Sequence, residues 1–141
     1  MRIRTAVVCV VLLAGLAGAG LLFAREPEGQ SAVTAQQLIA EALAGEAGKE
    51  VIAQTYIFPP GAVLPWHIHP DAHEIAYVLE GNFTFHRAGE EPREMKAGEA
   101  DYLAPNVVHR GMNKTDRPVK LFVVRIKPQD KPLVEEVPAP Q

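Results

Sequence analysis

Residues 61–81 constrain this chain more than any other stretch, because three of its five histidines lie there. On an extended strand, side chains two residues apart point to the same face. His67 and His69 would therefore project together, and Glu74 would supply a carboxylate just past a short turn. Two imidazoles and a carboxylate make up most of a typical transition-metal site. The stretch therefore predicts a strand that carries an incomplete metal site.

A series of short, β-favouring segments surrounds this stretch. The segments are rich in β-branched and aromatic residues or alternate in polarity, and turn sequences such as Pro59-Pro60-Gly61 separate them. Short strands at regular spacing are typical of all-β sandwiches and barrels. The expected strands are residues 51–58, 63–69, 74–79, 82–86, 93–96, 100–103, 107–113 and 119–127.

Length and composition limit what the chain can be. With 141 residues, of which 48% are hydrophobic, it is long enough for one domain with a real core. The formal net charge of −3 argues against a nucleic-acid partner, which calls for a basic surface. The one cysteine, Cys9, lies in an apolar N-terminal run, so the folded part has no disulfide and no cysteine nucleophile. Glycine-rich phosphate-binding motifs and a Gly-x-Ser-x-Gly elbow are also absent from the sequence.

The N-terminus has the pattern of an export segment. Arg2 and Arg4 precede residues 6–24, which are uncharged and apolar. A basic start followed by an apolar run is typical of a secretory signal, although an apolar run of this length also just spans a bilayer. For residues 1–24 we expect either a cleaved signal peptide or a retained membrane anchor. Either way the rest of the chain is expected outside the cytoplasm, in the periplasm or the extracellular space.

The rest of the chain divides into three parts. Residues 25–50 are expected to form a linker with one short helix over residues 34–43, because helix-forming residues follow Thr34 in the N-cap position. Residues 51–127 form the predicted barrel. Residues 128–141 are rich in proline and are expected to run extended over the surface without structure of their own.

A second histidine-containing stretch completes the predicted site. In residues 98–113 a glycine turn, a strand and a proline–asparagine break precede His109. This order would bring a third imidazole across the barrel, so His109 is the best candidate for the fourth ligand. The alternative for His67 and His69 is a pair of partly exposed strand histidines without a metal. His73 is expected at the rim of the site, because adjacent strand residues point to opposite faces and His73 would point away from Glu74.

The two stretches resemble the motifs of the cupins, small β-barrels of the double-stranded β-helix or jelly-roll type. The first cupin motif is Gly, five residues, His-x-His, three or four residues, Glu, six residues, Gly. Every position of this motif matches, at Gly61, His67, His69, Glu74 and Gly81. The second motif matches at the following positions: Gly98, His109 and Asn113.

The second motif departs from the cupin pattern at two positions. Ala104 stands where cupins have proline, with Pro105 one residue later, and Asn106 stands where they have glycine. The second change is mild, because asparagine accepts the left-handed backbone conformation most readily after glycine. The resemblance covers about residues 51–127. The tail sequence Lys131-Pro132-Leu133 also resembles that of small exported single-domain cupins.

The resemblance implies a metal centre. In metal-binding cupins, the histidines of both motifs and the glutamate of the first hold one divalent metal, which here implies His67, His69, Glu74 and His109. Three imidazoles and one carboxylate suit Fe, Mn, Ni, Co, Cu or Zn, and the sequence does not choose among them. Glu74 is also the expected catalytic residue, since it could leave the metal and act as a base.

Three functions are compatible with such a site. The first is a dioxygenase-like or other metal-dependent oxidoreductase that acts on a small molecule. The second is a non-enzymatic metal or small-ligand binding module or sensor, and the third is a metal-dependent isomerase or lyase. Most basic residues lie in turns or at strand ends, which favours an apolar or aromatic ligand. The expected cavity-lining residues are Val78, Phe83, Phe85, Leu103 and Met112.

The strand after the first motif has an apolar outer face. If Glu74 points into the barrel, Ile75, Tyr77 and Leu79 face outward. Three large apolar side chains on an outer sheet face seldom stay in contact with water. Either the predicted 34–43 helix or a second subunit would cover them, and we expect a homodimer.

Overall fold

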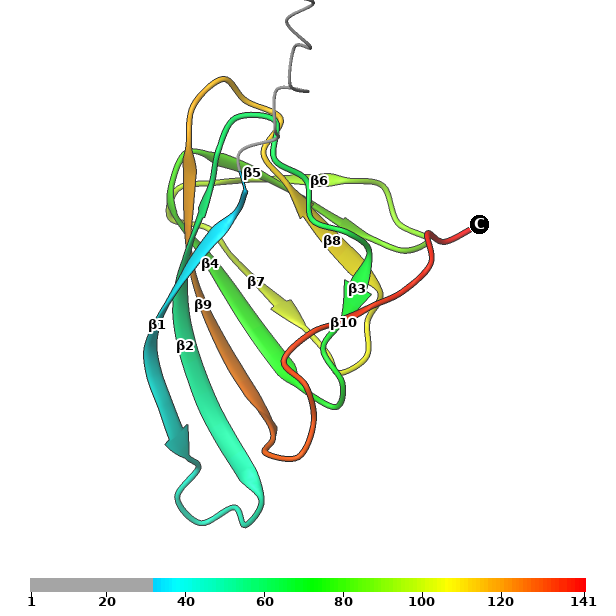
Figure 1. The fold of residues 1–141 in the computed structure, drawn as a ribbon. Coiled ribbons are helices and arrows are strands. Elements are labelled where there is room, and N and C mark those ends of the chain that lie inside the picture. The colour runs from blue at the N-terminus through cyan, green and yellow to red at the C-terminus, as the bar shows by residue number, and fades with distance from the viewer. Residues whose placement is uncertain (1–31) are drawn as a thin grey trace, which may run out of the picture.

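The computed structural model describes residues 32–141, which form two five-stranded β-sheets that face each other (Figure 1). This is the predicted all-β jelly-roll barrel, and the predicted export segment, residues 1–24, lies outside the described residues. The strand order is β1-β2-β9-β4-β7 in the first sheet and β10-β3-β8-β5-β6 in the second. The strands are β1 (Thr34–Ala42), β2 (Lys49–Phe58), β3 (His67–Ile68), β4 (His73–Glu80), β5 (Asn82–Arg87), β6 (Arg93–Lys96), β7 (Ala100–Leu103), β8 (His109–Met112), β9 (Val119–Pro128) and β10 (Glu135–Glu136).

The two sheets are paired to very different extents. In the first sheet, β2 and β9 pair along their whole length, from Lys49 opposite Pro128 to Phe58 opposite Val119. In the second sheet, β3 pairs with β8 only through His67 opposite His109. This single pair places two predicted ligands directly across from each other, at the first position of both strands.

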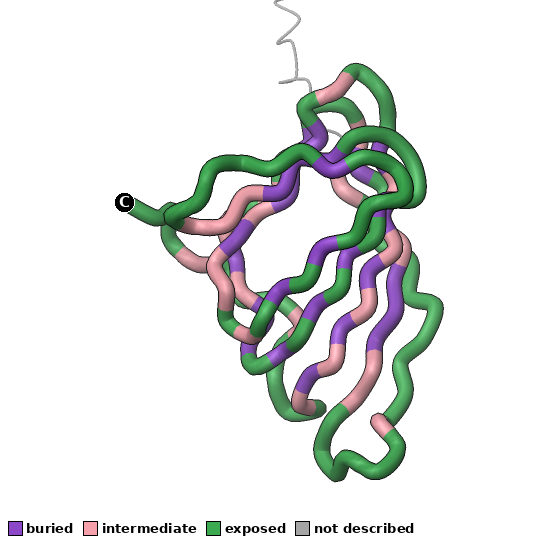
Figure 2. Tube along the Cα trace, turned by 180° about the vertical axis from the view of Figure 1, so that it is seen from behind, coloured by how far each residue is buried: buried purple, intermediate pink, exposed green. Residues whose placement is uncertain are grey.

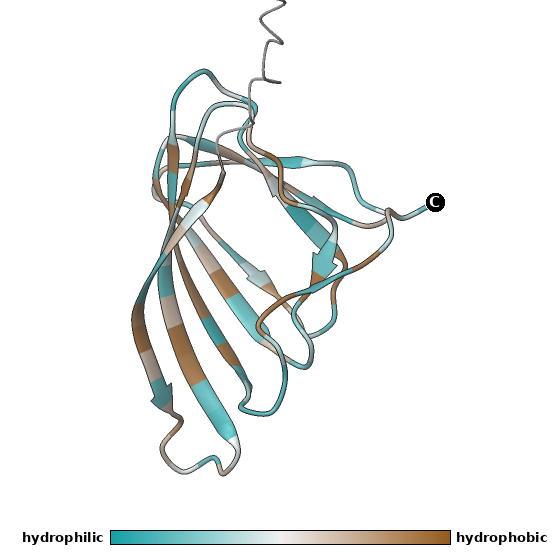
Figure 3. Ribbon diagram, in the orientation of Figure 1, coloured by the Kyte–Doolittle hydropathy of each residue, from teal (hydrophilic) through white to brown (hydrophobic). Residues whose placement is uncertain are grey.

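The core lies between the sheets and follows the two-residue period of the strands (Figure 2). In β4, Ala76 and Val78 are buried whereas Ile75 and Tyr77 are exposed, which confirms the inward and outward sets predicted for this strand. Apolar residues also occur in bands along the long strands of the first sheet (Figure 3). The largest fully buried side chains come from both sheets: Phe58, Val78, Met95, Leu103, Asn113 and Val119.

The helix predicted over residues 34–43 is wrong, because these residues form the edge strand β1. This strand pairs antiparallel with β2, from Thr34 opposite Ile57 to Ala42 opposite Glu50. All of its residues are exposed, so backbone pairing with β2, and not burial, selects the strand. Such tertiary pairing overrides the helix propensity of a short Ala-, Gln- and Leu-rich segment. Within residues 32–141 no helix is long and apolar enough to cross a membrane.

The C-terminal tail is extended, as predicted, but it is also attached to the second sheet. β10 pairs with β3, with Glu135 opposite Ile68. The backbone N–H of Val137 donates to the carbonyl of Trp66 over 2.9 Å. The expectation that the tail has no structure of its own is therefore wrong for these residues. In Figure 1 the tail (red) leaves β9 and passes beside β3.

Candidate metal centre

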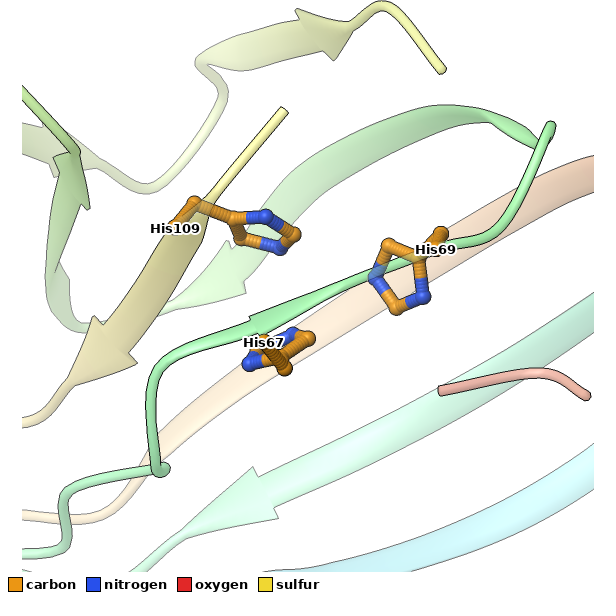
Figure 4. Close-up of side chains that lie close together, drawn as sticks. All are labelled: His67, His69 and His109. Atoms are coloured by element: carbon orange, nitrogen blue, oxygen red, sulfur yellow. The ribbon is translucent and has the colours of Figure 1, made fainter. Parts of the chain in front are cut away.

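Three histidines converge in the interior of the barrel, where β3 meets β8 (Figure 4). His67 begins β3, His69 follows the last residue of this strand, and His109 begins β8. The ring centroids of His67 and His109 lie 4.2 Å apart, and that of His69 lies 5.1 Å from each of them. All three side chains are buried, and one ring nitrogen from each lies within 4.8 Å of the others. The structure thus brings together the histidines that the two motifs predict.

Backbone carbonyls fix the orientation of all three rings. Nδ1 of His67 lies 2.8 Å from the carbonyl oxygen of Pro65, and Nδ1 of His109 lies 2.8 Å from that of Val107. Nδ1 of His69 lies 2.6 Å from a carbonyl oxygen of the C-terminal tail. A carbonyl only accepts hydrogen bonds, so each Nδ1 carries the proton and donates it. Each Nε2 is left with its lone pair, which is the form that binds a metal.

The surroundings of His69 fit a bound cation. Its Nε2 lies 2.8 Å from Oε2 of Glu74, and both side chains are buried. Despite this short distance, Nε2 has no hydrogen-bond partner among residues 32–141. A nitrogen lone pair and a carboxylate oxygen this close repel each other unless a positive charge lies beside them. Donor atoms of one metal lie roughly 3 Å apart, so a divalent cation held by the histidines and Glu74 would satisfy both groups.

A buried arginine, Arg125, faces the same interior. Its Nε donates to Oε2 of Glu74 over 2.6 Å, and its Nη1 donates to Oε1 of Gln54 and to the hydroxyl of Tyr56, both over 2.9 Å. This residue was not among the predicted site residues, because most basic residues of the sequence were expected in turns or at strand ends. Arg125 adds a positive charge to an interior for which only apolar lining residues were predicted. A sequence signal for Arg125 was available. Side chains of a strand alternate between its two faces, so Val119, Leu121 and Val123, which are buried, place Arg125 on the same inner face.

The interior shifts the ionisation of three site residues. Burial is the largest single influence on Glu74 and would by itself raise its pKa. The positive charge of Arg125 and the neighbouring His69 and His109 together outweigh burial and hold this pKa well below its usual range. Burial lowers the pKa of His67, and it lowers the pKa of His109 to about 4. At neutral pH Glu74 is therefore ionised and these two imidazoles are neutral, which are the forms that bind metals.

A cavity opens beside the histidines. Its volume of about 350 Å³ includes the open solvent at its mouth. The histidine site and the buried arginine form the polar part of its wall, and the rest is mainly apolar. Phe83 and Phe85 line it, as predicted. The other predicted lining residues are buried but do not line it: Val78, Leu103 and Met112.

Two non-glycine residues with positive φ shape the rim next to His69. They are Asp71 (φ 53°) and Asn106 (φ 62°). The side chain of Asn106 donates to Oδ1 of Asp71, and the backbone N–H of Asp71 donates to Oδ1 of Asn106, both over 3.0 Å. Asn106 thus adopts the left-handed conformation that its slot in the second motif requires, and this prediction is confirmed.

Asn113, the last residue of the second motif, has a structural role. Its side chain is fully buried. Nδ2 donates to the carbonyls of Phe58, Pro59 and Arg117, and Oδ1 accepts from Thr115. These bonds tie the end of β8 to the turn that follows β2.

His73 lies outside the site. It is exposed on the outer face of β4, where its Nδ1 lies 2.7 Å from the hydroxyl of Tyr102. The expectation that this ring points away from Glu74 is confirmed, but the ring lies on the outer face of β4 and not at the rim.

Comparison with known protein families gives one match. The family model of the cupin domain matches residues 54–125, which is about half of the chain. The matched residues include strands β3 to β8 and all four predicted ligands. No curated protein matches the chain.

Solved structures with the same fold include three with informative descriptions. An uncharacterized protein with a double-stranded β-helix domain from Klebsiella pneumoniae is 19% identical, with a TM-score of 0.62, and the alignment covers 82% of this chain and 90% of that one. A cupin 2 conserved barrel protein from Salinispora arenicola is 26% identical over 66% of this chain and 74% of that one, with a TM-score of 0.53. A DMSP lyase from Ruegeria pomeroyi is 25% identical over 74% of this chain but only 51% of its own length, with a TM-score of 0.58.

Proposed function

This chain belongs to the cupin family, and we propose that it binds one divalent transition metal and acts as a metal-dependent oxidoreductase, of dioxygenase type, on a small organic molecule. The observation that carries the proposal is the cluster of three buried imidazoles whose Nδ1 atoms are all bonded to carbonyls. A purely structural histidine cluster would leave three buried lone pairs facing one another, which is unfavourable. His67, His69, His109 and Glu74 would hold the metal.

A metal at this position would supply Lewis acidity and, if it is redox-active, electron transfer to or from a bound molecule. The side chains around the metal position would determine which molecules can bind there. Phe83 and Phe85 line the cavity with apolar surface, which limits water and suits an apolar or aromatic ligand. Protein ligands occupy four positions at most, so an octahedral metal would keep two positions for small molecules.

Arg125 refines the proposed substrate class. Its hydrogen bonds to described residues use Nε and Nη1, so Nη2 is available to a ligand in the cavity. The charges of Arg125 and Glu74 cancel, so with a divalent metal bound the interior keeps the positive charge of the metal. Such an interior favours a ligand with an anionic group. We therefore propose a small molecule with an apolar or aromatic body and one carboxylate or similar anion.

Glu74 is better suited to hold the metal than to act as the predicted base. Its carboxylate accepts from Arg125 over 2.6 Å in a buried pair. To take a proton it would have to give up part of this ion pair, and its low pKa makes it a weak base at neutral pH. We propose that its charge balances Arg125 and the metal during the reaction.

The test is oxygen uptake by the full chain loaded with each candidate metal in turn. The panel contains phenols and thiols, each with and without a carboxylate. We expect uptake with at least one metal, a lower KM for the carboxylate-bearing member of a pair, and loss of uptake in the His67→Ala/His109→Ala double variant. Arg125→Lys keeps the charge but not the planar fork, so it should raise KM for the carboxylates only. Absence of uptake with every metal would contradict the proposal.

The second candidate function is a non-enzymatic metal or small-ligand binding module, and the third is a metal-dependent lyase or isomerase. The similarity to a DMSP lyase at 25% identity supports keeping the lyase. Stoichiometric metal binding without turnover would favour the binding module, and product formation without oxygen uptake would favour the lyase. We further propose an exported location, which the basic start and apolar run of residues 1–24 support.

A further inference from the structure

We propose that the C-terminal segment 129–137 is part of the metal centre, because the backbone carbonyl of Leu133 positions the imidazole of His69. The inference rests on the proposed metal site and adds to it a residue that lies outside both cupin motifs. The contact is direct, since Nδ1 of His69 lies 2.6 Å from the carbonyl oxygen of Leu133, which is 64 positions away in the sequence. Leu133 is thus a positioning residue that acts through its backbone.

His69 depends on a distant partner, in contrast to the other two histidines. His67 and His109 begin strands, and each donates its Nδ1 proton to the carbonyl two residues before it, that of Pro65 or Val107. These bonds are local and form whenever the strand and its lead-in loop form. His69 follows the end of β3, and its Nδ1 is bonded to the tail instead.

The tail is anchored on both sides of Leu133. At its start, the backbone N–H of Gln129 donates to the carbonyl of Gly48 over 2.8 Å. At its end, β10 pairs with β3, and the N–H of Val137 donates to the carbonyl of Trp66 over 2.9 Å. The segment between these anchors passes His69, so the pairing of β10 with β3 places the Leu133 carbonyl at the ring.

The rim fixes the backbone of His69 but not its ring. The carbonyl of His69 accepts from the N–H groups of Ala72 and Asn106, over 3.2 and 3.3 Å. The side-chain torsions are not restrained by these bonds. The Leu133 carbonyl supplies that restraint, and it also keeps the ring proton on Nδ1. Without it, the proton can move to Nε2, which already lies 2.8 Å from Oε2 of Glu74, and form a hydrogen bond there, which would remove one metal ligand.

Two C-terminal truncations of the full chain test this proposal. Ending the chain after Pro128 removes the whole segment, whereas ending it after Val137 removes only residues 138–141 and keeps the Leu133 carbonyl and both anchors. In a competition titration with a chromophoric chelator, we expect Co²⁺ binding at least about 10-fold weaker after Pro128 and unchanged within about twofold after Val137. Equal affinity in a folded Pro128 truncation would overturn the proposal.

A second readout works without metal. Imidazole ¹⁵N chemical shifts distinguish the protonated nitrogen from the nitrogen with a lone pair. In the full chain we expect His69 to carry its proton on Nδ1. In the Pro128 truncation we expect the proton to exchange between Nδ1 and Nε2. The tautomers of His67 and His109 should not change, so these residues serve as internal controls. An unchanged His69 tautomer would contradict the proposal. Failure of the full chain to bind metal would instead overturn the proposed function.

A milder variant covers the case in which the Pro128 truncation does not fold. Val137→Pro in the full chain removes the N–H that donates to Trp66 and loosens the end of the segment without removing Leu133. We expect the same direction of change, with weaker Co²⁺ binding and a shifted His69 tautomer. Wild-type values for both measurements would count against the proposal.

Discussion

At the scale of single residues, burial makes the metal-free site sensitive to acid. His109 is 2% exposed, and its pKa in the folded chain is about 4, against 6.5 for the free side chain. His67 shifts in the same direction for the same reason. Between these two pH values, the unfolded chain takes up a proton at His109 that the folded chain does not bind. Folding is therefore less favourable at the acid end of this window.

We predict that the free energy of unfolding of the metal-free chain falls as pH falls from 6.5 towards 4, with His109 contributing up to about 3 kcal/mol of the loss. Urea unfolding in the presence of a chelator, at several pH values in this window, measures the slope. His109→Gln should make the slope shallower, because glutamine does not titrate. A variant slope as steep as that of the wild type would show that His109 does not cause the effect.

The metal-ligand residues could be predicted from the sequence, whereas the groups that orient their side chains could not. His67, His69 and His109 stand at motif spacings, and strand periodicity places the first two on one face. The partners of their Nδ1 atoms are backbone carbonyls, which no side-chain pattern marks. Arg125 was predictable only in part. Strand alternation places it on the inner face, but a single arginine in an apolar strand does not show which carboxylate it pairs with.

At the scale of strands, one buried carboxylate joins the edges of the two sheets. Asp101 of β7 accepts from Nη2 of Arg87 in β5 over 2.5 Å and from Nη1 of Arg93 in β6 over 3.2 Å. β7 ends the first sheet, and β5 and β6 belong to the second. The same Arg87 also meets Glu90 over 3.5 Å, but Glu90 is largely exposed.

We predict that Asp101→Asn destabilises the fold by about 2 kcal/mol, because it removes charge-assisted hydrogen bonds to a buried carboxylate. Glu90→Gln is the matched control, since it breaks an exposed ion pair to the same arginine and should cost less than about 0.5 kcal/mol. Urea unfolding monitored by tryptophan fluorescence measures both. Equal losses in the two variants would contradict the distinction between buried and exposed pairs.

Strand edges were the hardest part of the fold to predict. The composition of residues 34–43 favours a helix locally, and only the open edge of β2 makes it a strand. The tail is similar, because its prolines indicate extended chain but do not indicate which strand it joins. By contrast, most strands of residues 51–127 were placed correctly, since their alternation reflects burial on one face.

At the scale of the whole molecule, β4 presents an outer apolar face made of Ile75, Tyr77 and Leu79. These residues are 51%, 39% and 39% exposed, as predicted. In the same sheet, Ile75 and Tyr77 lie beside Val124 and Phe122 of β9, which extends the apolar surface. Residues 34–43 cannot cover this face as a helix, because they form the edge strand β1. We therefore still predict that a second copy of the chain packs against this apolar face.

We predict that the chain sediments as a dimer and that Tyr77→Glu shifts it to a monomer, because the introduced charge would be buried in the interface. Ala139→Glu introduces the same charge on the exposed tail and should leave the dimer intact. Sedimentation velocity over a range of concentrations distinguishes these outcomes. A wild-type chain that is monomeric at every concentration would refute the homodimer.

The central claim is that His67, His69 and His109, with Glu74, hold one divalent transition metal. The most direct test is elemental analysis of the full chain purified from its native compartment, together with the His67→Ala/His109→Ala double variant and a His73→Ala control. We predict about one metal ion per chain in the wild type and in the control, whose histidine lies outside the site, and none in the double variant. Full metal occupancy in the double variant would contradict the site.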